Sequence, residues 1–240
     1  MTQKKYHHVS SFASDYLKEI VYGGIDGIVT TFAVVAGFSG AQSQLAFLPV
    51  MTVLLFGSAN LFADGISMAL GSFLSNQADR DKYKTAMTKE MKTARDYVNW
   101  EQHEAEKILQ GYGYSAADSK QMTTMMQKKE SFWLDFLMKY ELHIEDPAHH
   151  QSVKIALATF FSFVFFGAIP LAPYVIWMGS GGTDMLFRMS VLFTGAAMLL
   201  LGLLRWKVTK QHILRSIGET FLVGSIAALI AYLVGASFRL

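Results

Sequence analysis

The chain has no cysteine among its 240 residues. This absence excludes a disulfide scaffold, a thiolate zinc site, an iron–sulfur cluster and a cysteine nucleophile. Charge is also scarce: charged residues make up 17% of the chain, against about 25% in a typical soluble domain. The formal net charge is only +2, which gives no reason to expect nucleic acid as a partner. Hydrophobic residues make up 52%, so the chain is too apolar for an ordinary soluble domain.

The few charges are unevenly distributed along the chain. Residues 20–78 contain two charged side chains, Asp26 and Asp64, and residues 155–204 again contain two. Residues 79–150, the insert, hold 24 of the 40 charged residues. A bilayer core requires long uncharged stretches, because a charge at its centre costs on the order of 3 kcal/mol or more. The pattern therefore predicts an integral membrane protein with one charged, water-exposed part.

A membrane-spanning helix needs about 20 mostly apolar residues, and five segments meet this requirement. They are residues 20–40, 45–75, 153–176, 185–204 and 213–236. The second is longer than a membrane needs, which predicts that it projects into water and continues as a polar helix. The fold class is thus an all-α integral membrane protein with five spans and an insert between spans two and three.

Lysine and arginine predict the orientation, because they are enriched in cytoplasmic loops. With five spans, 19 of the 21 bases fall on one side of the membrane and two, Arg188 and Arg239, on the other. Without the long insert the division is still 8 to 2. We expect a cytoplasmic N-terminus and an outside C-terminus. The short chain without a targeting extension favours a prokaryotic inner membrane, with a vacuolar-type membrane as the alternative.

The insert is predicted to form three helices. Residues 82–110 lack proline and glycine and are rich in helix formers, and Gly111 and Gly113 end this helix. Ser115 is a predicted N-cap of a second helix that ends near residue 128. The third, residues 131–145, ends before Pro147.

Acidic residues in and near span one have helical spacing. Asp15, Glu19 and Asp26 fall within about 40° of one another at 100° per residue, so they share one face that leads from the cytoplasm into the span. An acid inside a span indicates a functional site by default. The alternatives are a solvated turn for Asp15 and Glu19, and a helix-packing hydrogen bond for Asp26.

Span two carries Asn60, Asp64 and Met68 at intervals of four residues, which forms a polar stripe. Carboxylates suit hard divalent cations, and a thioether adds softness that favours a transition metal such as Fe²⁺. The alternatives are plain core filling for Met68 and an internal hydrogen bond for Asp64.

In the insert, Glu90, Glu101 and Glu104 fall on one face of the predicted helix. Three glutamates on one face repel one another unless a cation binds there. Glu141, with Met138 one turn before it, is a candidate second wall of such a site. The alternative is a solvated face neutralised by neighbouring lysines. No nucleophile elbow, phosphate-binding loop or dinucleotide fingerprint occurs, so we do not expect an enzyme.

Three segments resemble the vacuolar iron transporter family. Residues 22–30 (YGGIDGIVT) resemble its first-span signature, and residues 63–71 (ADGISMALG) its second-span signature. Residues 136–142 (FLMKYEL), followed by 145–147 (EDP), resemble the end of its cytoplasmic domain. The order, the spacing and the five-span plan agree over roughly residues 12–238.

The resemblance implies a Fe²⁺ transporter, with protons as the counter-ion and no cofactor. It implies a homodimer with the metal path between the subunits. Asp26 and Met68 fall on the family's intramembrane metal ligands, and Asp15 and Glu19 on its entrance acids. The cytoplasmic metal-binding glutamates correspond to the following residues: Glu90, Glu101, Glu104 and Glu141, with Met138 beside them.

Three positions depart from the pattern of the resemblance. Thr93 stands at a glutamate position of the insert, Asn60 at the position of an intramembrane glutamate, and Asp64 at a glycine position. The span-two acid has in this reading moved one turn along the helix, from residue 60 to residue 64. These departures affect metal selectivity and the number of metals and protons moved.

The sequence therefore predicts four parts. They are a cytoplasmic N-terminal segment (1–19), spans one and two (20–78), a cytoplasmic helical metal-binding domain (79–150) and spans three to five (151–240). The expected function is export of Fe²⁺, with Mn²⁺ and other divalent metals as further substrates, in exchange for protons. The alternatives are a membrane-anchored metal sensor or storage protein, and a membrane hydrolase that uses paired carboxylates.

Overall fold

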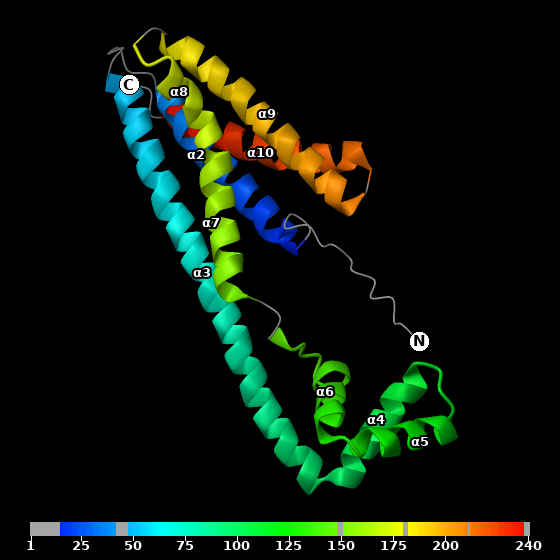
Figure 1. The fold of residues 1–240 in the computed structure, drawn as a ribbon. Helices are drawn as coiled ribbons and strands as arrows, with labels where there is room; N and C mark the ends of the chain where they lie inside the picture. Colours follow the sequence, from blue (N-terminus) through cyan, green and yellow to red (C-terminus); the bar gives the residue numbers. More distant parts are fainter. Residues whose placement is uncertain (1–14, 42–47, 148–150, 180–181, 211, 238–240) are drawn as a thin grey trace, which may run out of the picture. The chain divides into compact units, whose positions relative to one another are not determined.

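The computed structural model describes residues 15–41, 48–147, 151–179, 182–210 and 212–237, and every regular element within these ranges is a helix (Figure 1). The chain divides into two compact units. The membrane unit comprises Met1–Phe73 and Val153–Leu240, and the insert unit comprises Leu74–Ser152. The prediction of an all-α protein is confirmed.

Five helical segments are long and apolar enough to cross a membrane, which agrees with the predicted number of spans. The first two belong to α2 (Leu17–Ala41) and α3 (Leu48–Asp96). The last two are α9 (Thr183–Thr209) and α10 (Ile213–Ser237). The predicted start of span two, residue 45, lies outside the described residues. Large apolar side chains such as Leu55 and Leu214 are exposed on these helices, as a lipid environment requires.

Helix α3 continues beyond its apolar part as one helix of 49 residues. Its first part, to Phe73, belongs to the membrane unit, and the remainder belongs to the insert unit. The prediction that the second span continues as a polar helix is therefore confirmed.

The third span is not one regular helix. It consists of α7 (Ser152–Ala168), a short 3₁₀ helix, η2 (Ile169–Leu171), and α8 (Ala172–Ile176). Pro170 lies in the 3₁₀ segment and Pro173 at the start of α8. A proline has no backbone N–H and its ring clashes with the preceding turn, which explains the interruption.

In the membrane unit, α2 packs against both α9 and α10. Ile28 of α2 is buried in a cluster with Phe166 of α7 and with Ala197 and Leu201 of α9. Helix α2 also approaches α7 closely, because the Ser162 hydroxyl donates to the Ile20 carbonyl at 2.6 Å. These contacts fix the helix that carries Glu19 and Asp26.

The insert unit contains the end of α3 and three further helices, α4 (Val98–Gly111), α5 (Ala116–Gln127) and α6 (Glu130–Tyr140). The prediction of one continuous helix over residues 82–110 is wrong, because the chain turns at Tyr97 between α3 and α4. This turn lets Ala105 and Leu109 of α4 bury themselves against Trp133 of α6. Apolar burial thus outweighs local helix propensity.

The predicted ends of α4 and α5 agree with the structure. Helix α4 ends at Gly111, and Gly113 follows with φ +96°, a conformation that favours glycine. Ser115 is the N-cap of α5, and its hydroxyl oxygen accepts the Asp118 N–H at 3.1 Å. The prediction for the third helix is wrong at its end, because α6 ends at Tyr140, five residues before residue 145.

Candidate metal sites

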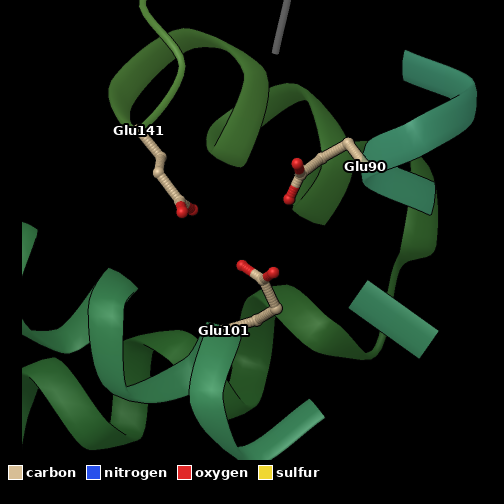
Figure 2. A group of neighbouring side chains, drawn as sticks. All are labelled: Glu90, Glu101 and Glu141. Atoms are coloured by element: carbon tan, nitrogen blue, oxygen red, sulfur yellow. The ribbon is translucent and has the colours of Figure 1, made fainter. Parts of the chain in front are cut away.

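Three glutamates of the insert unit converge on one point. Figure 2 shows Glu90, Glu101 and Glu141 pointing toward one another. One carboxylate oxygen from each lies within 4.8 Å of the others. Glu90 comes from α3, Glu101 from the first turn of α4, and Glu141 is the C-cap residue of α6. Three separate helices thus supply the three carboxylates.

Two features of the chain create this convergence. The first is the turn at Tyr97, which reverses the chain between Glu90 and Glu101 and leaves the Glu101 N–H bonded to the Tyr97 carbonyl at 3.1 Å. The second is the packing of α6 against α4 described above, which carries Glu141 to the same place. An ion pair between Arg95 and Glu130, at 2.7 Å, further joins the end of α3 to the start of α6.

The cluster is largely buried, and some of its carboxylate oxygens lack hydrogen-bond partners among the described residues. Glu101 is 1% exposed and Glu90 6% exposed. Each of the three glutamates has one buried carboxylate oxygen that finds no hydrogen-bond partner within the described part of the chain. Buried charged oxygens normally have partners, and those without one call for an explanation such as a bound ion.

Burial and like charges also alter the protonation of the cluster. Burial, together with the charges of Glu141 and Glu90, raises the pKa of Glu101 to about 8. Burial likewise raises the pKa of Glu141. Without a cation, Glu101 is protonated at neutral pH and can donate a hydrogen bond to Glu141. A divalent cation would displace this proton and supply the missing partner for all three carboxylates.

The other predicted ligands of the insert are Glu104 on α4 and Met138 on α6. Glu104 forms an ion pair with Lys107 at 2.7 Å, and its charge still acts on Glu101 and Glu141. Met138 is 1% exposed on α6, one turn before Glu141. Glu104 therefore borders the three-glutamate cluster and is partly neutralised by its own lysine.

A second group of acids lies in the membrane unit. The carboxylates of Asp26, on α2, and Asp64, on α3, are close enough for their charges to interact. Within the described residues, no hydrogen bond or ion pair neutralises the Asp26 carboxylate. Met68 follows Asp64 by one turn of α3 and is half-buried. Two like charges that interact within the spans favour a bound cation or a shared proton.

The predicted entrance acids lie around the start of α2. Glu19 is in the first turn of α2 and half-buried, while Asp15 lies two residues before α2 and is exposed. Asp15 itself has helical backbone, and the Ile20 N–H donates to the Tyr16 carbonyl at 2.9 Å just before α2 becomes regular. The common face of Asp15, Glu19 and Asp26 stays a prediction.

Sequence reasoning missed one charged arrangement in the membrane unit. Glu219 forms ion pairs with Arg205 and Arg215 at 2.7 and 2.9 Å. The spacing of Arg215 and Glu219, four residues apart on one helix, was the available signal for their pairing.

The fold and its two acidic sites define an all-α integral membrane protein with carboxylates inside its spans and in a helical insert. The chain belongs to the VIT family, whose sequence profile matches residues 17–236. It is 33% identical to a vacuolar iron transporter of Toxoplasma gondii, over 98% of this chain and 78% of that protein. It is 30% identical to vacuolar iron transporter 1 of Arabidopsis thaliana, over 94% of this chain and 88% of the relative. A vacuolar iron transporter of Plasmodium falciparum is also 30% identical, over 92% of this chain and 81% of that protein.

Proposed function

We propose that this protein transports Fe²⁺, and with it Mn²⁺ and related divalent metals, out of the cytoplasm in exchange for protons. The observation that carries the proposal is the pair of interacting carboxylates, Asp26 and Asp64, inside the spans of a VIT-family protein. The relatives named as vacuolar iron transporters support iron as the cargo.

The three-glutamate cluster is the proposed site where metal is collected before transport. Its oxygens suit Fe²⁺ and Mn²⁺, and the absence of cysteine restricts softer ligation to methionine. Met138 and Glu104 are the further ligands proposed here, since Met138 is buried one turn before Glu141 and the Glu104 charge acts on Glu101 and Glu141. Exchange of the Glu101 proton for a metal ion makes loading of the cluster reversible.

From the insert, metal passes to Asp15 and Glu19 and then enters between spans one and two. Asp26 and Met68 hold it there, and Asp64 completes the carboxylate pair. We propose a homodimer with this path between its subunits, since two-fold symmetry would supply two copies of each ligand. Two copies of Asp26 and Met68 would then place two carboxylates and two thioethers around each metal ion.

Protons are the proposed counter-ions at the intramembrane site. When the metal leaves, the charges of Asp26 and Asp64 repel each other without a cation in a medium of low dielectric constant. Proton binding removes their repulsion, and the bound proton is released again when the next metal ion arrives. This cycle couples metal export to proton entry.

The test is transport in proteoliposomes with a pH-sensitive dye inside, comparing Fe²⁺, Mn²⁺, Co²⁺ and Zn²⁺. The proposal predicts metal flux with proton flux in the opposite direction, and loss of both in Asp26→Asn. The matched control is Asp184→Asn, the same change at an exposed acid in the first turn of α9. Full metal flux in Asp26→Asn would reject the intramembrane site. Metal binding without any flux would instead support a membrane-anchored sensor or storage protein.

A further inference from the structure

One end of the membrane unit carries a concentration of positive charge that the transport path does not use. Four bases, Arg205, Lys207, Lys210 and Arg215, lie at the end of α9 and the start of α10, and Glu219 is the acid among them. These groups give the segment 205–219 a formal charge of +3. The remaining described spans contain few charges, so this basic cluster stands out on the membrane unit.

Glu219 holds two of these bases in a defined arrangement. One carboxylate oxygen contacts Nη2 of Arg205 at 2.7 Å, and the other contacts Nε of Arg215 at 2.9 Å. A guanidinium has five N–H donors, and these ion pairs use few of them. One carboxylate also neutralises only one of two guanidinium charges. The pair is therefore oriented but still has positive charge and free donors.

The two lysines add unneutralised charge. Lys207 lies in the last turn of α9, and Lys210 closes that helix in the left-handed conformation, with φ 51°. Both side chains are exposed, and among the described residues neither forms an ion pair. Their ammonium groups add positive charge to this end of the membrane unit.

The apolar residues beside the bases indicate a position at the membrane boundary. Trp206 is 40% exposed between Arg205 and Lys207, and Leu214 is 83% exposed beside Arg215. Tryptophan is enriched where lipid headgroups meet the hydrocarbon region. The long arginine and lysine side chains reach from helix ends to the headgroups. Bases and apolar side chains thus alternate as a lipid–water boundary requires.

We propose that the 205–219 segment binds the phosphate group of an anionic phospholipid such as phosphatidylglycerol. Arg205 and Arg215 would donate to the phosphate oxygens, for which the planar guanidinium is well suited. Lys207 and Lys210 supply the charge that favours an anionic over a zwitterionic lipid, and Leu214 and Trp206 contact its acyl chains. The location of this lipid in the cytoplasmic leaflet rests on the orientation proposed above, while the binding chemistry does not.

The test is native mass spectrometry of the full chain in detergent with equal amounts of phosphatidylglycerol and phosphatidylcholine. We expect phosphatidylglycerol to bind preferentially. Lys207→Gln with Arg215→Gln should weaken its binding roughly fivefold for each base removed. Arg188→Gln, at the opposite end of α9 and also exposed, is the matched control and should bind the lipid like the wild type.

Because Arg215→Gln removes an ion pair, weaker lipid binding in that variant could result from misfolding. A second variant therefore tests the site without breaking an ion pair. Lys207→Gln with Lys210→Asn leaves both ion pairs intact, and asparagine tolerates the left-handed conformation at residue 210. It should also lose affinity for phosphatidylglycerol. Equal binding of the two lipids, or unchanged binding by both variants, would overturn the proposal. Displacement of the lipid by millimolar inorganic phosphate would also overturn it, because the site would then be one for a free anion. Transport activity plays no part in the readout, so failure here leaves the proposed function untouched.

Discussion

Glu101 lies buried between Glu141 and Glu90, and its proton competes directly with any metal ion at the cluster. Burial and the two neighbouring charges raise its pKa to about 8, so the metal-free site is protonated at neutral pH. Metal affinity should therefore rise by about tenfold for each pH unit up to about pH 8 and then level off. Calorimetric titration of the full chain with Mn²⁺ from pH 6 to pH 9 measures this slope. An affinity that does not change over this range would contradict the assignment.

The raised pKa of Glu101 also makes the stability of the fold depend on pH. The dependence is opposite to that of a carboxylate in an ion pair, whose pKa is lowered by folding. Between the unfolded pKa of about 4.5 and the folded pKa of about 8, the folded, metal-free protein binds more protons than the unfolded chain. The stability of the insert unit should therefore fall as the pH rises through this window. Glu101→Gln cannot lose a proton and should flatten the dependence, which thermal unfolding at pH 5, 6.5 and 8 can follow. An equally steep dependence in the variant would assign the effect to another group.

Asp64 and Asn60 provide a test of whether the span-two acid has moved by one turn. Asn60 lines a cavity of about 760 Å³ between α2, α3 and α10, so a glutamate side chain has room there. Asp64→Gly should lower metal transport roughly 10- to 100-fold, because Asp26 loses its carboxylate partner. Asn60→Glu combined with Asp64→Gly should recover most of the activity. Proteoliposome flux measures both variants, and a double variant as inactive as the single one would show that the two positions are not equivalent.

At the scale of the helix, the sequence predicted the spans well and one insert helix badly. The spans were predictable because the bilayer imposes a length and an apolar composition that can be counted directly. The break at Tyr97 was not predictable, since residues 82–110 contain neither glycine nor proline. It arises from the burial of Ala105 and Leu109 against α6, which are contacts between residues far apart in the sequence. The interruption of the third span could have been predicted from Pro170 and Pro173. A count of apolar residues alone does not detect it.

Close packing of α2 on α7 gives a prediction for the helix pair. A Cβ atom added at Gly23 would lie 2.7 Å from the Thr159 carbonyl oxygen, which is backbone and cannot rotate away. Gly23→Ala should therefore destabilise the membrane unit by about 1–3 kcal/mol, the usual cost of overpacking. Gly37→Ala is the matched control on the same helix, because nothing lies within 4 Å of its added Cβ. Thermal unfolding in detergent compares the two, and equal transition temperatures would show that α2 and α7 separate without cost.

In the molecule as a whole, charge is concentrated in the insert and scarce in the spans, and this separation indicates a membrane protein with a water-exposed part. The sequence placed Glu90, Glu101 and Glu141 as candidates from helical spacing and resemblance. The convergence of three helices on one point came only from the structure, because it depends on the turn at Tyr97 and on where α6 packs. The same holds for Glu219, whose partner Arg205 lies on another helix. The spacing of residues along the sequence does not reveal which helices contact one another.

The orientation of the whole molecule decides the direction of transport, and the absence of cysteine makes it directly measurable. Met125 on α5 is 63% exposed, and Met178, between the third and fourth spans, is 54% exposed. Met125→Cys and Met178→Cys each introduce a single thiol by the same substitution. The predicted orientation places 19 of the 21 bases on the cytoplasmic side, so a membrane-impermeant maleimide should label Met178→Cys in intact cells. Met125→Cys should react only after the cells are permeabilised. The reverse labelling would invert the molecule, so that the insert would collect metal from outside and the proposed export would become uptake.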